Sequence, residues 1–212
     1  MKYQNLIFDF DGTLADSLEE GRLIFNDFAK KHDIDEIKKE DLNTLKNYNL
    51  KEFLKIKKLS KARFLQFIAV AKIELGKRIS KIPLIENVEM LLPKLQQHTN
   101  FMGILTSNSQ KNVEVFLKEN QLLGYFDHIG SSSKLLNKSR YINAMLKKYS
   151  LNRHETLFIG DEIRDIQASH KSKIDVAAVT WGFNSRTSLK KEKPTFCFDT
   201  PKDLLNLITP TT

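Results

Sequence analysis

From residue 83 onward, short apolar runs alternate with longer amphipathic segments, and this alternation limits the folds open to the chain. Strands are expected at residues 101–106, 126–130, 156–159, 176–179 and 195–198. Helices are expected at residues 86–97, 110–120, 139–149, 164–171 and 201–208. Strands that alternate with helices are typical of a parallel sheet with helices on both faces. The sequence therefore predicts an α/β fold.

The N-terminal part adds one more strand and then departs from this alternation. Residues 3–10 form a short apolar run that ends abruptly at Asp11 and Gly12, which suits a buried strand. Residues 17–32 then show the stripe of an amphipathic helix, and residues 34–82 show helical periodicity throughout and contain no proline. Because the helical stretch follows the first strand directly, we expect it to be an inserted subdomain. The expected division is an α/β core of residues 1–15 and 83–212 and a helical cap of residues 16–82.

The charge of the chain is concentrated in the helical stretch. The composition is that of an ordinary globular protein, with 41% hydrophobic and 28% charged residues, and the formal net charge is +8. Residues 34–82 hold 13 Lys and Arg against 6 Asp and Glu, an excess of seven positive charges. Such an excess could indicate an anionic partner, although a solvated helical face explains it equally well. Nucleic acid is not the expected partner.

The sequence also bears on location and on metal chemistry. No apolar run approaches the roughly 20 residues that span a bilayer, and the first residues lack the apolar region of a signal peptide. The single cysteine, Cys197, excludes an internal disulfide, and the five histidines lack zinc-ligand spacing. We expect a cytoplasmic location and no membrane contact. The state of assembly stays open between monomer and homodimer.

Polar clusters lie at the places where reactive residues of a parallel sheet belong, near the carboxyl ends of strands. The first cluster is Asp9-Phe10-Asp11-Gly12-Thr13. Its two carboxylates are two residues apart, so they share one side of an extended segment and favour a hard cation such as Mg²⁺. Asp-Gly alone is a common turn, but the longer string arises by chance in a chain like this only about once in several hundred. Gly12 allows a sharp turn and a close approach to an anion.

Two further clusters carry weaker signals when each is considered alone. Thr106, Ser107 and Asn108 end the strand at 101–106, where a hydroxyl could donate to a phosphate oxygen. Such residues are more often loops or helix caps. Lys134 and Lys138 precede the helix expected at residue 139. A lysine at a helix N-terminus is unfavourable for the helix dipole unless an anion joins it.

The last cluster, Gly160-Asp161-Glu162-Ile163-Arg164-Asp165, follows the strand at 156–159. Another carboxylate at this place could complete a metal site begun by Asp9 and Asp11. As a helix cap alone, Asp161 would need no further role. The two interpretations are separated only when the clusters are considered together.

In their order and spacing, these motifs resemble those of the haloacid dehalogenase superfamily, over residues 3 to about 208. The helical stretch looks like the type I cap of the phosphoglycolate phosphatase and β-phosphoglucomutase branch. The resemblance implies a Rossmann-like parallel sheet core with an inserted all-helical cap subdomain. Ser139 departs from the family pattern, which often has proline after the motif lysine.

The resemblance also implies a Mg²⁺-dependent phosphomonoester hydrolase that acts on a small phosphorylated metabolite. Asp9 would be the nucleophile, and Asp11 would protonate the leaving oxygen and later activate water. Ser107 is preferred over Thr106, and Lys138 over Lys134. The implied metal-site residues are Asp9, Asp11 (through its carbonyl), Asp161 and Asp165. The implied phosphate-binding residues are Ser107, Asn108, Lys138, Thr13 and Gly12.

Three alternatives share some of these features. A sugar phosphomutase would keep every motif, so the sequence leaves it open. A dehalogenase would have no use for Asp11. A non-catalytic module that binds a partner through the basic helical stretch would be favoured by the loss of Asp9 or Asp11, and both are present.

Overall fold

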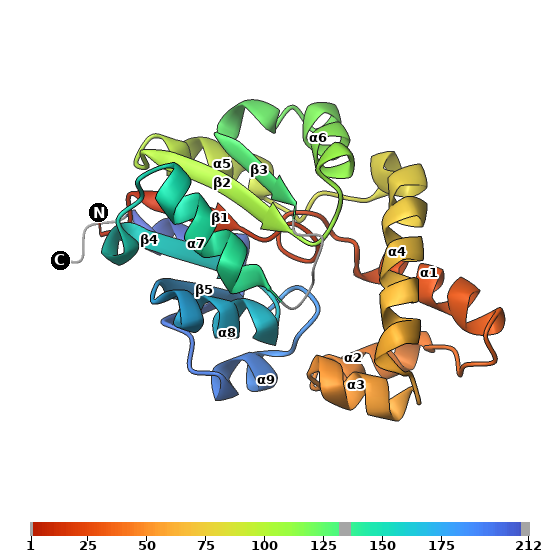
Figure 1. The fold of residues 1–212 in the computed structure, drawn as a ribbon. Coiled ribbons are helices and arrows are strands. Elements are labelled where there is room, and N and C mark those ends of the chain that lie inside the picture. Colours follow the sequence, from red (N-terminus) through yellow and green to blue (C-terminus); the bar gives the residue numbers. More distant parts are fainter. Residues whose placement is uncertain (1, 132–136, 209–212) are drawn as a thin grey trace.

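The computed structural model describes residues 2–131 and 137–208, and within them six strands form one parallel sheet (Figure 1). The strand order is β3-β2-β1-β4-β5-β6. The strands are β1 (Asn5–Phe8), β2 (Phe101–Thr106), β3 (His128–Ser131), β4 (Thr156–Gly160), β5 (Asp175–Val179) and β6 (Phe196–Phe198). The predicted α/β fold is confirmed. Because the chain crosses from β3 back past β1 to β4, the carboxyl ends of β1, β2 and β4 surround the point where ligands bind in sheets of this kind.

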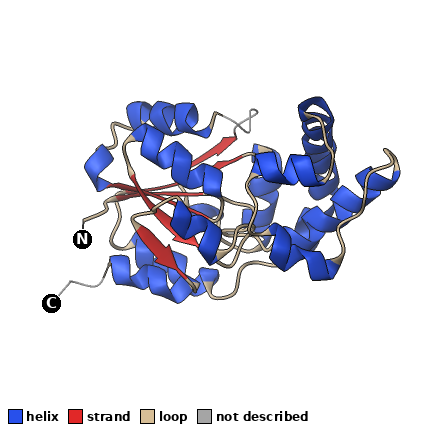
Figure 2. Ribbon diagram, turned by 90° about the horizontal axis from the view of Figure 1, so that it is seen from below, coloured by secondary structure: helices blue, strands red, loops and turns tan. Residues whose placement is uncertain are grey.

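Helices cover both faces of the sheet, as Figure 2 shows from below. One face packs against α5 (Val88–Gln96), α6 (Gln110–Glu119) and η5 (Pro201–Leu207). The other packs against α7 (Lys138–Lys148), α8 (Ile163–Ser172) and α9 (Arg186–Lys191). Successive residues of β1 alternate between the two cores: Leu6 and Phe8 belong to the first and Ile7 to the second.

Three elements differ from the sequence-based expectation. β1 ends before residue 10, because the Phe10 carbonyl accepts from the backbone N–H groups of Leu14 and Ala15 instead of a neighbouring strand. The C-terminal helix η5 is a 3-10 helix. The short helix α9 was not predicted, and its buried apolar side chain is Leu189, too little for a periodic pattern.

Residues 16–82 contain only helices and loops, all of them described: α1 (Leu18–Lys30), η1 (Lys39–Asp41), α2 (Leu42–Leu45), α3 (Leu50–Ile56), α4 (Lys61–Arg78) and η2 (Ile79–Lys81). We call these residues the helical insert. It lies to one side of the sheet (Figure 1) and has a hydrophobic cluster of its own around Phe25. The Phe25 ring packs edge-on against Phe53 and Phe67, with centroid distances of 5.6 and 5.3 Å. None of the described helices is long and apolar enough to cross a membrane.

The two connections between the insert and the rest of the chain run side by side. Asp16 donates its backbone N–H to the Pro83 carbonyl at 2.8 Å, and Ile85 donates to the Leu14 carbonyl at 2.9 Å. Since the chain leaves and re-enters at one place, the insert can be added without disturbing the sheet. For this reason we propose the division into a core of residues 1–15 and 83–212 and a cap of residues 16–82.

Candidate active site

Asp9 lies immediately after β1 and its carboxylate is held in one orientation. The residue is 2% exposed. Its Oδ1 accepts from the Phe10 backbone N–H at 2.8 Å, and its Oδ2 accepts from Lys138 Nζ at 2.6 Å. Its own N–H donates to the Ile159 carbonyl of β4, which extends the sheet ladder by one residue. The carboxylate therefore lies where β1 and β4 end.

The carboxylate of Asp161 is held from two sides. Thr13 Oγ1 donates to its Oδ1 at 2.7 Å, and the backbone N–H of Phe183 donates to its Oδ2 at 2.7 Å. Gly12 has a φ of 76°, and a Cβ there would lie 2.3 Å from Asp161 Oδ2, so only glycine fits. The structure thus gives Gly12 and Thr13 a role beside Asp161. Their contact with phosphate remains a prediction.

Three carboxylates from two parts of the chain meet in the interior. Asp9, Asp161 and Asp165 each place an oxygen within 4.8 Å of the others. All three are at most 2% exposed. Asp165 lies in the first turn of α8, where its Oδ2 caps the helix by accepting the Glu162 backbone N–H at 3.0 Å. The predicted metal-site carboxylates other than Asp11 are therefore brought together.

Lys138 is a cation in contact with this cluster. It is the first residue of α7, is 5% exposed, and places Nζ 2.6 Å from Asp9 Oδ2 and 2.5 Å from Asp165 Oδ1. Burial alone would lower the pKa of the ammonium group, but the charges of Asp165 and Asp9 outweigh it and raise the pKa of Lys138. The alternative residue, Lys134, lies outside the described residues.

The carboxylate cluster fits a divalent cation. Three ionised carboxylates exceed the single charge of Lys138 by two negative charges. Burial raises the pKa of Asp161 and of Asp165, which shows that the charged forms are poorly compensated by the protein alone. A bound cation restores that balance, and oxygen-only donors are the ligands that Mg²⁺ takes in proteins.

Asp11 is not one of the three clustered carboxylates, and it lines a cavity. Its carboxylate is half-buried and accepts from Asn108 Nδ2, at 3.1 Å to Oδ2. Burial, together with the charge of Asp9, raises the pKa of Asp11 to about 6. A carboxyl group with such a pKa can hold and release a proton near neutral pH. The predicted metal contact of Asp11, through its backbone carbonyl, remains a prediction.

The two candidate hydroxyl groups at the end of β2, those of Thr106 and Ser107, lie in different surroundings. Thr106 is 1% exposed and its Oγ1 accepts from the Asn108 backbone N–H at 2.9 Å. Ser107 lines the cavity together with Asn108. The Asn108 side chain is fixed by its Oδ1, which accepts from Ser109 N–H and Asn112 Nδ2. Its amide therefore presents Nδ2 to Asp11.

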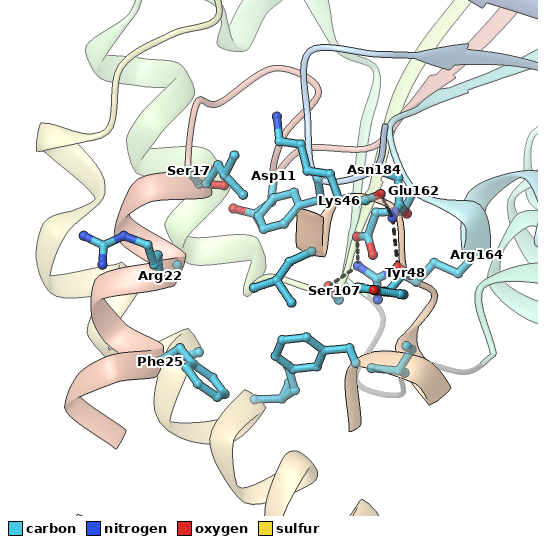
Figure 3. A pocket seen from close by; sticks show the side chains of 18 of the residues that line it. Asp11, Ser17, Arg22, Phe25, Lys46, Tyr48, Ser107, Glu162, Arg164 and Asn184 are labelled. Atoms are coloured by element: carbon cyan, nitrogen blue, oxygen red, sulfur yellow. Dashed lines mark hydrogen bonds and ion pairs between the residues drawn. The ribbon is translucent and has the colours of Figure 1, made fainter. Parts of the chain in front are cut away.

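Two charged cavity residues, Glu162 and Arg164, received no role from the sequence. Their side chains form an ion pair, and Arg164 Nη2 lies 3.4 Å from Ser107 Oγ (Figure 3). Both line the cavity. Their position inside the Gly160–Asp165 motif could have indicated a place in the site, because residues of a loop that follows a strand lie around the end of that strand.

Asn184 is a further residue that sequence reasoning missed. It is 8% exposed, and its Nδ2 donates to the carbonyls of Lys46 and Tyr48 in the helical insert, at 3.1 and 3.2 Å. Its Oδ1 accepts from the Ile163 backbone N–H at 2.9 Å. Ser185 adds a backbone N–H to the Lys46 carbonyl at 2.8 Å. These bonds connect the insert to the loop after β5, and through Asn184 to the start of α8.

A cavity of about 520 Å³ lies between this edge of the sheet and the helical insert (Figure 3). On the core side it is lined by Asp11, Ser107, Asn108 and Arg164. On the opposite side it is lined by side chains of α1 to α4. The two parts of the chain therefore enclose one space next to the carboxylates.

Comparison with known proteins gives consistent matches along the chain. Residues 6–179 match the family described as haloacid dehalogenase-like hydrolase. A phosphoglycolate phosphatase from Synechococcus elongatus is 32% identical over 206 residues, 97% of each chain. The pyrophosphatase PpaX of Bacillus cereus (strain Q1) is 25% identical over 215 residues, 98% of this chain and 97% of that protein. Among solved structures, a predicted phosphatase from Clostridium acetobutylicum shares the fold, with a TM-score of 0.83, 24% identity and coverage of 98% and 99% of the two chains.

Proposed function

Because the chain belongs to the haloacid dehalogenase-like hydrolase family, we propose that it is a Mg²⁺-dependent phosphomonoester hydrolase that works through an aspartyl-phosphate on Asp9. The observation that carries the proposal is the buried group of Asp9, Asp161 and Asp165 around Lys138, at the carboxyl end of the sheet. The relative named phosphoglycolate phosphatase supports a small phosphorylated metabolite as the substrate.

In the proposed first step, an Asp9 oxygen attacks phosphorus and forms an acyl phosphate, while Asp11 gives its proton to the leaving oxygen. The pKa of Asp11, about 6, supports this role, because the group then keeps a protonated fraction near neutral pH. In the second step, Asp11 takes a proton from the water that attacks the acyl phosphate. The bond from Asn108 Nδ2 keeps the Asp11 carboxylate at the cavity side of Asp9 during both steps.

The remaining residues bind and orient. Ser107 and Lys138 would hold the equatorial phosphate oxygens, where charge accumulates in the transition state, and Asn108, Gly12 and Thr13 would assist. A metal ion held by Asp9, Asp161, Asp165 and the Asp11 carbonyl would offset the negative charge between carboxylate and phosphate. The helical insert would close the cavity against bulk water.

The direct test is release of inorganic phosphate from phosphoglycolate and from p-nitrophenyl phosphate, with and without Mg²⁺. We expect metal-dependent release from both. A sugar phosphomutase would instead isomerise a sugar phosphate without net phosphate release. A non-catalytic binding module would release none under any condition. Phosphate release therefore separates the proposed hydrolase from both alternatives, and isomerisation of a sugar phosphate separates the mutase from the binding module.

The replacement Asp11→Asn is expected to lower kcat/KM for an alkyl phosphate by roughly 10²–10⁴-fold, because the amide has no proton to give to the leaving oxygen. The loss should be much smaller for p-nitrophenyl phosphate, whose leaving group needs little protonation. Steady-state kinetics on the two esters, with the wild-type enzyme in parallel, measures both losses. Equal losses on the two esters would show that Asp11 does not act as the proton donor.

Removal of the metal is expected to reduce phosphate release to background. Excess EDTA should silence the enzyme and added Mg²⁺ should restore it, whereas Ca²⁺ should not. Ca²⁺ prefers longer bonds and more ligands, so it would misplace Asp9 relative to phosphate. The control is EDTA saturated beforehand with Mg²⁺. Full activity in excess free chelator would remove the metal from the mechanism.

A further inference from the structure

The cavity beside Asp11 is far larger than a phosphate group and a two-carbon acid require. Its volume of about 520 Å³ lies in the range of roughly 300–1,000 Å³ that is typical of pockets for drug-sized ligands. Asp11, Ser107 and Asn108 line one end of it, so its other end receives whatever is attached to the phosphate. The chemistry of that end therefore selects the organic part of the substrate.

The far wall of the cavity is apolar and aromatic. It is formed by side chains that share one face of α4 together with residues from α1 to α3: Phe64, Phe67, Ile68, Ala71, Leu75, Phe25, Leu42, Leu45, Leu50 and Phe53. The rings hold one another in place, since Phe67 packs against Phe25 and Phe64 at centroid distances of 5.3 and 6.1 Å. Phe53 and Phe67 are only half-buried, and a ligand that covers them removes their apolar surface from water.

The two arginines at the cavity, Arg22 and Arg164, already have partners within the protein, while Lys46, Lys51 and Lys72 also line it. Arg22 bonds to Glu19 at 2.7 Å and to the Ile37 carbonyl at 2.9 Å. Arg164 is paired with Glu162. A second anionic group on the substrate would have to compete with these bonds at either arginine. An apolar group meets no such competition at the aromatic wall.

We propose that the preferred substrate is a phosphomonoester whose alcohol part is a bulky apolar or aromatic group, which lies against Phe53, Phe67 and Ile68. This inference rests on the proposed phosphomonoesterase function of the same site. It names a different chemistry from a small hydroxy acid, because burial of apolar surface, and not ion pairing, contributes the selectivity.

The test is a series of n-alkyl phosphates from ethyl to hexyl, measured on the wild-type protein with Mg²⁺. These esters have leaving groups of nearly equal reactivity, so differences in kcat/KM report on the cavity. Burial of one methylene corresponds to at most about a fourfold gain (about 0.8 kcal/mol, at 1.4 kcal/mol per tenfold). We expect kcat/KM for hexyl phosphate to exceed that for ethyl phosphate by roughly tenfold or more.

Variants locate the effect within the cavity. Ala71→Phe and Ile68→Trp add bulk to the wall and should lower kcat/KM for hexyl phosphate by a larger factor than kcat/KM for ethyl phosphate, so that the advantage of the longer ester is lost. Leu65→Phe is the matched control, because Leu65 lies on the same helix and is 59% exposed, away from the cavity. A flat or falling series on the wild-type protein, with ethyl phosphate hydrolysed, would overturn the inference and leave the proposed function intact. Absence of phosphate release from the alkyl esters, from phosphoglycolate and from p-nitrophenyl phosphate alike would instead overturn the proposed function.

Discussion

Replacement of Asp9 by asparagine is expected to abolish phosphate release, with a loss in kcat of at least about 10⁴-fold, as is usual when a nucleophile is removed. The amide oxygen cannot form the acyl phosphate. Two donors contact the Asp9 carboxylate, the Phe10 N–H and Lys138 Nζ. The asparagine side chain has a single oxygen, so it can accept from only one of them. Because one buried negative charge disappears at the same time, the fold should remain and Tm should change little.

The measurement is phosphate release together with the thermal unfolding midpoint of the same preparation. Asp35→Asn is the matched control, since it makes the same chemical change at an exposed position of the helical insert. Its rate should equal that of the wild type. Near-normal turnover in the Asp9→Asn protein, on a correctly folded preparation, would contradict the covalent mechanism.

Replacement of Lys138 by methionine is expected to impair both catalysis and stability. The side chain is 6% exposed and contacts Asp9 and Asp165. Its loss leaves these buried carboxylates without a cation, and breaking a buried pair in this way costs about 3–5 kcal/mol. Loss of one donor to the transition-state charge should lower kcat/KM by about 10²–10³-fold.

The stability effect should depend on the metal. In EDTA the Lys138→Met protein should unfold at a clearly lower urea concentration than the wild type, and Mg²⁺ should restore part of the difference, because the ion replaces the missing positive charge. Lys147→Met, at the exposed end of α7, is the control and should change neither stability nor rate. Equal stability of the two variants in EDTA would show that Lys138 does not offset the negative charge of the buried carboxylates.

Several features of the protein follow from local sequence alone. The strands at the core of the sheet are short apolar runs, and β2 begins and ends at the predicted residues, Phe101–Thr106. Residues 61–78 form one helix whose face of Phe64, Phe67, Ile68 and Ala71 was visible as a helical period. Asp9, Asp161 and Asp165 were predicted to meet, because parallel strands end at one edge and their loops share that edge.

One expectation failed where local signals compete, and one contact of the motif residues was not foreseen. The run at residues 3–10 is apolar throughout, yet β1 ends at Phe8 because the following glycine turn redirects the Phe10 carbonyl. The motif residues Gly12 and Thr13 were assigned to phosphate from the resemblance. In the structure both residues lie against the carboxylate of Asp161, which is 148 residues from Thr13 along the chain. Such a contact leaves no trace in the local pattern.

The sequence by itself thus determined the parallel sheet and the all-helical character of residues 16–82, because periodicity is a local property, and its motifs named the carboxylates that we propose as catalytic. Only the tertiary structure decided how the insert meets the core. Asn184 lies 138 residues from Lys46, whose carbonyl it binds. The aromatic wall of α4 could have been an ordinary buried helix face until the fold placed it opposite Asp11 and left a cavity of about 520 Å³ between them. Which side chains face an empty space depends on the packing of segments that are distant in sequence, and that packing is a property of the whole fold.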